Sequence, residues 1–273
     1  MYKHYKVSVV MPAYNEEAFI ATAVREFKAV PEVDEIVVVD NNSKDRTAEL
    51  ATAAGARVVT ETKQGYGHAS KTALMSATGD LVLIVEPDGT FRARDVYKFL
   101  SYADEFDAVI GTRTAKSCIW TGANMGWFLR YGNVAVAKLL EYLHNGPCFT
   151  DVGCTFKMIH RSVLQQIEPF LDVGKSHFSP QLMTVLVRTR MRCIEIPVHY
   201  RSRLGVSKIT GSFWKAWKLG WKMIFMIIGY RFRSLPVLQS SVSKEVLIDI
   251  GEHKEANQPS SSASGQPAVS GKH

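Results

Sequence analysis

The stretch Leu81-Val-Leu-Ile-Val85, followed directly by Glu86-Pro-Asp-Gly-Thr90, decides the fold that we expect of this chain. Five apolar residues, mostly leucine and β-branched, are typical of a strand buried on both faces of a sheet. Pro87 biases Glu86 toward an extended backbone, in which residues two apart point to the same side. Glu86 and Asp88 therefore face one point in space, and Gly89 lets the chain turn away.

Two carboxylates that converge at the end of a strand suit a hard divalent cation. Carboxylate oxygens are the ligands that Mg²⁺ and Mn²⁺ prefer, and such an ion usually also binds the phosphates of a substrate. The motif therefore predicts Mg²⁺ or Mn²⁺ at Glu86 and Asp88. A solvated acidic turn explains these residues equally well, so the choice between a metal site and a plain turn depends on the other motifs of the chain.

Strands alternate with helices along the first 85 residues. The expected strands are 7–11, 35–39, 57–60 and 81–85, and the expected helices lie at about 16–30, 43–54 and 63–77. This alternation predicts right-handed βαβ units, and hence an α/β fold with a mostly parallel central sheet and helices on both faces. Further on, the expected strands are 108–110, 154–159 and 193–198, and the expected helices are 95–102, 129–143, 162–167 and 180–188.

Polar side chains cluster where these strands end. Tyr14, Asn15 and Glu16 follow the first strand, Asp40-Asn-Asn42 follows the second, and the acidic pair follows the fourth. Open α/β sheets bind ligands beyond the carboxyl ends of their strands. The sequence therefore predicts a binding site at this edge.

Charge, motifs and cysteine content limit the kinds of binding partner and the classes of protein that we expect. The net charge of +7 and the pI of about 9.2 favour nucleotides, nucleic acid or an anionic membrane surface. We expect no nucleic-acid partner, because no basic stripe interleaved with stacking aromatics occurs outside the C-terminal region. The first strand is not followed by GxGxxG, which argues against a dehydrogenase. Four cysteines without a CxxC pair predict neither a zinc site nor a disulfide framework, and favour the cytoplasm.

The segment 213–228 has an amphipathic pattern. Trp214, Trp217 and Trp221, with Ile224, Phe225 and Ile228, recur at helical spacing, and Lys215, Lys218 and Lys222 flank them. Aromatic residues bordered by lysines suit the plane of a membrane interface, although a helix packed on the core shows the same spacing. We expect no membrane span, because a span needs roughly 20 predominantly apolar residues.

These patterns predict three parts of the chain. We expect a catalytic domain over 1–209, an amphipathic helix over 210–235 that lies peripherally on the cytoplasmic face of a membrane, and a largely disordered tail over 236–273. The tail is rich in Ser, Gly, Gln and Pro from about residue 257. The oligomeric state is not readable from the sequence.

Several short motifs in this order resemble one enzyme family. They are Pro12-Ala-Tyr-Asn-Glu-Glu17, Val39-Asp-Asn-Asn-Ser-Lys-Asp-Arg-Thr47, the acidic pair, Gly111-Thr-Arg113, Thr150-Asp-Val-Gly-Cys154 and the basic run ending at Lys208. Over roughly 5–230 the chain resembles family 2 glycosyltransferases with the GT-A fold. It is most similar to the branch of dolichol-phosphate mannose synthases and bacterial polyprenyl-phosphate glycosyltransferases.

The resemblance implies a role for each matching residue. The nucleotide of a nucleotide-diphosphate-sugar donor is expected at Pro12, Tyr14, Asn15, Glu17 and Asp40, with Lys71 and Arg113 as further donor contacts. Glu86 and Asp88 match the metal motif, and Arg203 and Lys208 match cations near the diphosphate or the acceptor phosphate. Two departures from the family pattern stand out. The first metal carboxylate is Glu86 instead of aspartate. The family's arginine is usually three residues before a glycine, whereas Arg201 and Arg203 are four and two residues before Gly205.

The implied reaction is inverting transfer of a sugar to an acceptor, most simply a polyprenyl phosphate. Asp151 matches the acidic residue that faces the acceptor. It is a candidate general base for an alcohol acceptor, a positioning residue beside Arg203 for a phosphate acceptor, or a plain turn residue. The alternatives are a soluble hydroxyl compound or glycan as acceptor, and a non-catalytic nucleotide-sugar-binding protein.

Overall fold

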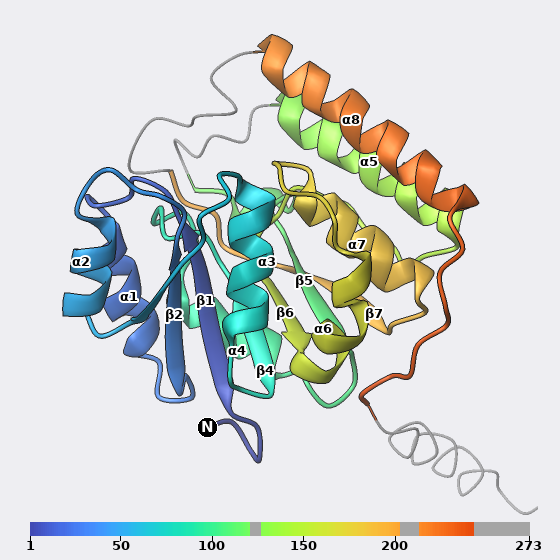
Figure 1. Cartoon of the computed structure of the whole chain (residues 1–273). Helices are drawn as coiled ribbons and strands as arrows, with labels where there is room; N and C mark the ends of the chain where they lie inside the picture. Colours follow the sequence, from blue (N-terminus) through green and yellow to red (C-terminus); the bar gives the residue numbers. More distant parts are fainter. Residues whose placement is uncertain (121–126, 203–212, 243–273) are drawn as a thin grey trace, which may run out of the picture. The chain divides into compact units, whose positions relative to one another are not determined.

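The fold is built on a seven-stranded sheet in the order β3-β2-β1-β4-β6-β5-β7 (Figure 1). The computed structural model describes residues 1–120, 127–202 and 213–242. The strands are β1 (Val7–Ala13), β2 (Glu35–Asp40), β3 (Arg57–Thr60), β4 (Leu81–Ile84), β5 (Ala108–Thr112), β6 (Lys157–His160) and β7 (Cys193–Pro197). All seven strands predicted from the sequence are present, and the residues from Met1 to Val242 form one compact unit.

Strand direction brings the polar loops to one edge of the sheet. β1 lies parallel between β2 and β4, with Ala13 opposite Asp40 and Val10 opposite Ile84. β6 alone runs antiparallel to its neighbours β4 and β5, and β7 is parallel to β5. The carboxyl ends of the parallel strands and the amino end of β6 therefore share an edge. The α/β fold with a mostly parallel sheet is confirmed.

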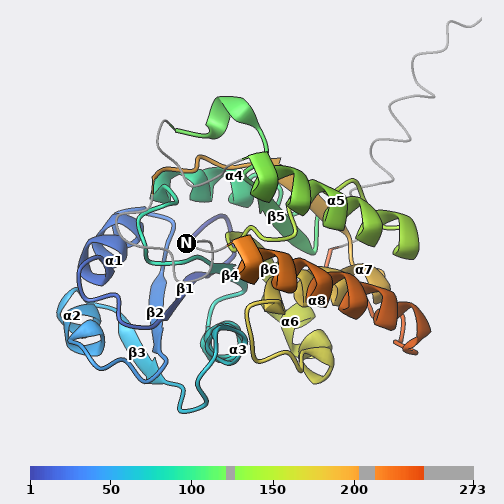
Figure 2. The same ribbon diagram turned by 90° about the horizontal axis from the view of Figure 1, so that it is seen from above.

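Each face of the sheet has its own apolar core, because neighbouring residues of a strand point to opposite faces. Met11 of β1 packs in the core that holds α1 (Ile20–Lys28), α2 (Thr47–Ala53) and α4 (Val96–Leu100). Val10 packs in the other core, with α3 (Tyr66–Ser76), α6 (Arg161–Ile167) and α7 (Phe178–Arg188). Figure 2 shows the two layers of helices on either side of the sheet.

Some elements differ from the sequence-based bounds. The helix expected from residue 16 begins at Ile20, because residues 14–17 form a turn bonded to the loop after β2. The helix expected at 95–102 is a 3₁₀ turn, η1 (Ala93–Asp95), followed by α4. β6 begins at Lys157 and not at Cys154, because the residues before it belong to the site described below.

The amphipathic helix α8 (Phe213–Phe232) packs beside α5 (Trp127–His144), as Figures 1 and 2 both show. Ile227 and Tyr230 are buried in the core, and the Tyr230 hydroxyl accepts a hydrogen bond from Gln181 Nε2 at 2.7 Å. The opposite side of α8 carries exposed aromatic rings. One face of this helix is thus packed on the domain, and the other is open.

Short connecting elements complete the chain. They are η2 (Lys116–Cys118) after β5 and η3 (Glu168–Phe170) after α6. Beyond α8 the backbone follows the domain, where Leu238 N donates to Thr189 O at 3.1 Å. Within the described ranges, the helices are either too short or too polar to cross a bilayer.

Candidate active site

The loops after β1 and β2 are joined by side-chain hydrogen bonds. Asn15 has a left-handed backbone (φ 52°), its N–H donates to Ser43 Oγ at 2.9 Å, and its Oδ1 accepts from Lys44 N at 2.8 Å. Glu17 Oε2 accepts from Arg46 N at 3.1 Å. Asn15 and Glu17, both predicted donor-site residues, therefore brace two loops into one rim. Pro12 is the next-to-last residue of β1, paired with Val39, and Tyr14 lies in the turn that follows.

Asp40 is the last residue of β2, directly before the second of these loops. Its side chain is only 8% exposed, and Oδ2 accepts from Ser43 N at 3.3 Å. The other oxygen, Oδ1, is buried and has no hydrogen-bond partner among the described residues. Buried acceptors are normally satisfied, so an orphaned one beside a rim is a position where a ligand N–H or O–H fits.

Asn41, expected only as a member of the polar cluster after the second strand, ties a third loop to the rim. Its amide nitrogen donates to Glu61 O at 2.9 Å and to Lys63 O at 2.8 Å, and its oxygen accepts from Gly65 N at 2.8 Å. The buried side chain therefore fixes the entry into α3. A polar residue directly after a strand was the available signal, but its partners are not visible in the sequence.

The turn after β4 is ordered by its own hydrogen bonds. Asp88 is 2% exposed, and its Oδ1 accepts from Thr90 N at 3.1 Å and Thr90 Oγ1 at 2.6 Å. Gly89 has φ 76°, a conformation that other residues seldom adopt. Arg201 N donates to Thr90 O at 2.8 Å, so the start of the basic run lies against the acidic turn.

Within the described ranges, no cluster of three or more His, Cys, Asp or Glu side chains gathers to hold a metal ion. The donor set offered after β4 is two carboxylates, Glu86 and Asp88. Mg²⁺ commonly binds through one or two carboxylates and completes its shell with water and substrate phosphates. The set therefore fits a cation bound together with a phosphate ligand.

Arg113 and Asp151, predicted separately, form one buried ion pair. Arg113 Nε donates to Asp151 Oδ2 at 2.8 Å, and Nη2 donates to Oδ1 at 2.9 Å. The backbone N–H groups of Arg113 and Gly153 add bonds of 3.1 and 3.0 Å. Both carboxylate oxygens are thus occupied, in the two-pronged geometry that arginine and carboxylates favour. β5 and the antiparallel β6 bring these two loops together.

The environment keeps Asp151 ionised. Its side chain is 0% exposed, and burial by itself raises the pKa of Asp151. The charge and hydrogen bonds of Arg113 outweigh burial, so the pKa lies below its ordinary value. A fully bonded carboxylate with a lowered pKa is a poor proton acceptor. Asp151 pairs with Arg113 in this structure. Arg203, which was considered from the sequence as a residue oriented by Asp151, lies outside the described residues.

Two further charged residues, the half-buried Glu195 and the buried Lys157, hold the Asp151 loop and were not predicted. Glu195 of β7 accepts from Thr150 N at 2.9 Å and Asp151 N at 3.0 Å. Lys157 Nζ donates to Ser179 Oγ at 2.7 Å and to Cys154 O. Burial lowers the pKa of Lys157 to about 8. Both residues lie in strands that were predicted from their apolar neighbours, and nothing in the sequence indicates that their charged side chains hold the loop before β6.

Tyr200 connects the acidic turn with the ion pair. Arg113 Cζ lies 5.2 Å from the centre of its ring. Burial raises the pKa of Tyr200; Arg113 opposes this rise, and the charges of Asp88 and Glu86 add to it. Tyr200 is therefore close enough to Glu86, Asp88 and Arg113 for the charges of all three to act on its hydroxyl.

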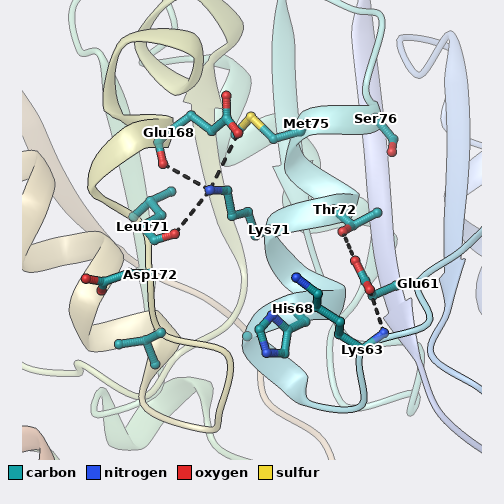
Figure 3. A pocket seen from close by; sticks show the side chains of 12 residues that line it. Glu61, Lys63, His68, Lys71, Thr72, Met75, Ser76, Glu168, Leu171 and Asp172 are labelled. Carbon is teal, nitrogen blue, oxygen red and sulfur yellow. Dashed lines mark hydrogen bonds and ion pairs between the residues drawn. The ribbon is translucent and has the colours of Figure 1, made fainter.

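Lys71 is bound elsewhere. Its Nζ donates to Glu168 O and Leu171 O, both at 3.2 Å, and lies 3.5 Å from Glu168 Oε1 (Figure 3). These partners line a groove of about 510 Å³ between α3 and the chain after α6. Lys71 therefore joins α3 to that segment in this structure, and the nucleotide contact expected of it stays a prediction. Arg203 and Lys208 lie outside the described residues.

Comparison with known proteins identifies the family. The sequence model described as "Glycosyl transferase family 2" matches residues 8–168. An uncharacterized glycosyltransferase of Mycobacterium bovis is 32% identical over 212 residues, which cover 76% of this chain and 90% of that protein. A dolichyl-phosphate hexose transferase of Haloferax volcanii is 31% identical, covering 74% of this chain and 86% of its own.

A more distant relative and a solved structure extend the comparison. An undecaprenyl-phosphate 4-deoxy-4-formamido-L-arabinose transferase of an Enterobacter species is 26% identical, covering 88% and 72% of the two chains. Glucosyl-3-phosphoglycerate synthase of Mycobacterium tuberculosis, solved with Mn²⁺, UDP and glucosyl-3-phosphoglycerate, shares the fold. Its TM-score is 0.62 at 20% identity, covering 84% and 80% of the chains. The family match and the relatives above 30% identity show that this chain is a glycosyltransferase and belongs to glycosyl transferase family 2.

Proposed function

We propose that the enzyme transfers a sugar from a nucleotide-diphosphate sugar to a polyprenyl phosphate, with inversion at the anomeric carbon. The observation that carries this proposal is the convergence of three features on one edge of the sheet. They are the orphaned Asp40 Oδ1, the carboxylate turn at Asp88, and the buried Arg113–Asp151 pair. β2, β4 and β5 each deliver one of them.

The donor is assigned to the rim between the first two loops. Asp40 Oδ1 offers an acceptor for an N–H of the base or an O–H of the ribose. Pro12, at the end of β1, and Tyr14, Asn15 and Glu17 after it are assigned to the same nucleotide. The solved relative with the same fold was crystallised with UDP and Mn²⁺. That relative supports a nucleotide diphosphate here, while the identity of the base and of the sugar stays open.

The charge of the leaving diphosphate is the main electrostatic barrier. Glu86 and Asp88 would hold Mg²⁺ or Mn²⁺, and Asp88 is already oriented by Thr90. When bound, the ion neutralises the charge that develops on the departing phosphate. Arg203 and Lys208, which match cations near the diphosphate in the family, would supply further positive charge from the basic run after Arg201.

The state of Asp151 favours an anionic acceptor. An alcohol needs a base to take its proton, whereas a phosphate oxygen is already a nucleophile. Asp151 has both oxygens bonded and its pKa lowered, so we assign it to positioning Arg113. The names of the two relatives that act on dolichyl and undecaprenyl phosphates agree with this assignment.

The open face of α8 supports a membrane-bound acceptor. Trp217, Trp221 and Phe225 are exposed, with ring centres 6.0 and 5.6 Å apart in sequence order. Lys218 and Lys222 are exposed on the same helix. Aromatic rings flanked by lysines match the interface of an anionic bilayer, so we assign α8 to peripheral binding at a membrane surface.

A transfer assay tests the proposal. Purified enzyme is incubated with Mn²⁺, a panel of UDP- and GDP-sugars and a prenyl phosphate, and the product is analysed by mass and anomeric configuration. We expect a prenyl-phosphate sugar of inverted configuration. Transfer to glycerol or a glycan but not to a prenyl phosphate would establish a hydroxyl acceptor instead, and donor binding without turnover would show a non-catalytic protein.

A further inference from the structure

Beyond the acidic turn, three short segments lie side by side. Phe91 pairs with Tyr200 in an antiparallel bridge, and Ile119 pairs with Tyr200 in a parallel bridge. Trp120 N donates to Tyr200 O at 2.9 Å, and Arg201 N donates to Thr90 O at 2.8 Å. The segments 90–92, 118–120 and 200–201 therefore form a miniature sheet next to Asp88.

Alternation along these segments separates their side chains. Phe91 and Tyr200 point inward and are buried, with ring centres 5.6 Å apart. Arg92, Arg201 and Trp120, which follow Phe91, Tyr200 and Ile119 in the chain, are more accessible, as expected for the other side of extended backbone. We name these three side chains the Arg–Trp–Arg platform.

The platform places two guanidinium groups on one indole ring. Arg92 Cζ lies 5.5 Å and Arg201 Cζ lies 5.2 Å from the centre of the Trp120 ring, which is 46% exposed. Both distances are within the range of cation–π contacts. Arginines held in this way keep their N–H edges available, and the planar fork matches phosphate oxygens.

The positive charge of the platform is poorly balanced. The carboxylate nearest to Arg201 is Glu26, whose Oε1 lies 3.9 Å from Nη1. Arg201 Nε is buried without a hydrogen-bond partner, and Arg92 forms no ion pair, within the part of the chain that the structure describes. Among the described residues, Glu26 is thus the one carboxylate within 4 Å of either guanidinium, it contacts Arg201 alone, and one Arg201 donor is left over. This is the arrangement expected of a site that awaits an anionic ligand.

We propose that the Arg–Trp–Arg platform binds the phosphate group of the acceptor. This inference rests on the proposed function. An oxygen of the bound phosphate forms the new bond to the anomeric carbon, while the bond from that carbon to the donor diphosphate breaks. The electron pair leaves with the nucleoside diphosphate, and no proton is transferred. The platform begins two residues after Thr90, whose N–H and hydroxyl bond Asp88, so it borders the turn to which the metal and the diphosphate are assigned.

Kinetics with a water-soluble acceptor test this inference. Citronellyl phosphate is the probe, and the variants are Arg92→Gln and Trp120→Leu, with Arg94→Gln as the matched control because Arg94 is exposed on the same turn. We expect the acceptor KM to rise about tenfold or more in the first two variants. The donor KM should stay within about twofold of wild type, and the control should leave both unchanged.

The outcomes separate the two proposals. If the wild type transfers sugar to citronellyl phosphate but Arg92→Gln and Trp120→Leu keep its acceptor KM, the platform assignment is overturned and the proposed function stands. If the wild type transfers to hydroxyl acceptors only, both fall. A folded state of each variant is checked by its thermal midpoint, and Arg92→Lys provides a milder change, because lysine keeps the charge without the planar fork.

An anionic lipid headgroup presents the same phosphate chemistry. Flotation with phosphatidylglycerol vesicles distinguishes the two sources. Binding of the acceptor predicts that Arg92→Gln floats like the wild type. Loss of flotation with an unchanged KM for citronellyl phosphate would assign the platform to the headgroup and overturn the inference.

Discussion

At the residue scale, the Arg113–Asp151 pair explains how one loop can carry a fixed cation into the site. Neither residue was expected to contact the other, because 38 positions separate them in the chain. The antiparallel insertion of β6 between β4 and β5 brings them together. The Asp151 carboxylate accepts four hydrogen bonds, so it holds the Arg113 side chain in a fixed orientation and has no free oxygen to accept a proton.

Removing one charge of this pair should destabilise the fold. Asp151→Asn leaves the buried guanidinium without its counter-ion, and such losses typically cost about 3–5 kcal/mol. We expect a drop of that order in the free energy of unfolding from urea titration, and a smaller drop for the double variant Arg113→Met with Asp151→Leu. Equal stability of Asp151→Asn and wild type would show that the pair is not formed in solution.

Asp40 should matter for the donor and little for the fold. Asp40→Asn keeps the size of the side chain but removes the charge at the orphaned oxygen. A hydrogen bond to a charged group contributes about 1.5–3 kcal/mol, so the dissociation constant for the nucleoside diphosphate should rise roughly 10- to 150-fold. Calorimetry measures this constant. An unchanged constant would place the nucleotide elsewhere.

Lys157 predicts a pH dependence of stability. Its pKa is about 8 when folded and 10.5 ordinarily, so between these values the unfolded chain holds a proton that the native state has released. Stability therefore rises with pH in that window. The unfolding free energy of wild type relative to Lys157→Met should increase from pH 8 to 10. Lys218→Met, at an exposed position, is the control; a difference independent of pH for both variants would contradict the burial argument.

At the scale of single elements, the sequence was informative where periodicity was strong. Every strand was found, because buried parallel strands are short apolar runs bounded by polar turns. Strand order was not accessible: nothing in Lys157–His160 indicates that this strand runs against its neighbours. The loop clusters at Asp40 and Asp88 were predicted from strand ends, whereas Asn41, Tyr200 and the Arg–Trp–Arg platform depend on contacts between distant segments.

Helix α8 has one packed face and one exposed face. The packed face buries Ile227 and Tyr230 in the domain, and membrane binding by the exposed face stays a proposal. The segment 233–242 then continues along the domain, with Ser241 N donating to Asp107 Oδ1 at 2.7 Å. The compact unit therefore includes α8 and the ten residues after it.

Substitutions on the open face of α8 should weaken membrane binding without unfolding the domain. For Trp217→Ser with Trp221→Ser, we expect at least a tenfold weaker association with phosphatidylglycerol vesicles, because two exposed rings are lost. Binding of the wild type should also weaken with salt, since lysines contribute. Tyr97→Ser, an exposed aromatic on α4, is the control. Association that is equal in all three proteins would remove α8 from the membrane surface.

At the scale of the whole molecule, one edge of the sheet organises the chemistry. The carboxyl ends of β1, β2, β4 and β5 and the amino end of β6 meet there, so groups from residues 12 to 201 lie along the same edge. Lys71 lies in the expected helix, and its side chain contacts the segment after α6. The helical period gives the face of a residue, but the sequence does not show which segment packs against that face.

The most direct test of this arrangement is calorimetric titration of UDP and GDP into the enzyme with and without Mn²⁺. We expect at least one nucleotide to bind, with an affinity that Mn²⁺ raises tenfold or more. Asp88→Asn should abolish that gain, and Asp80→Asn, at the opposite end of β4, should preserve it. Binding that is indifferent to Mn²⁺, or a gain that survives in Asp88→Asn, would contradict the claim that the carboxylates after β4 hold the cation and the diphosphate together.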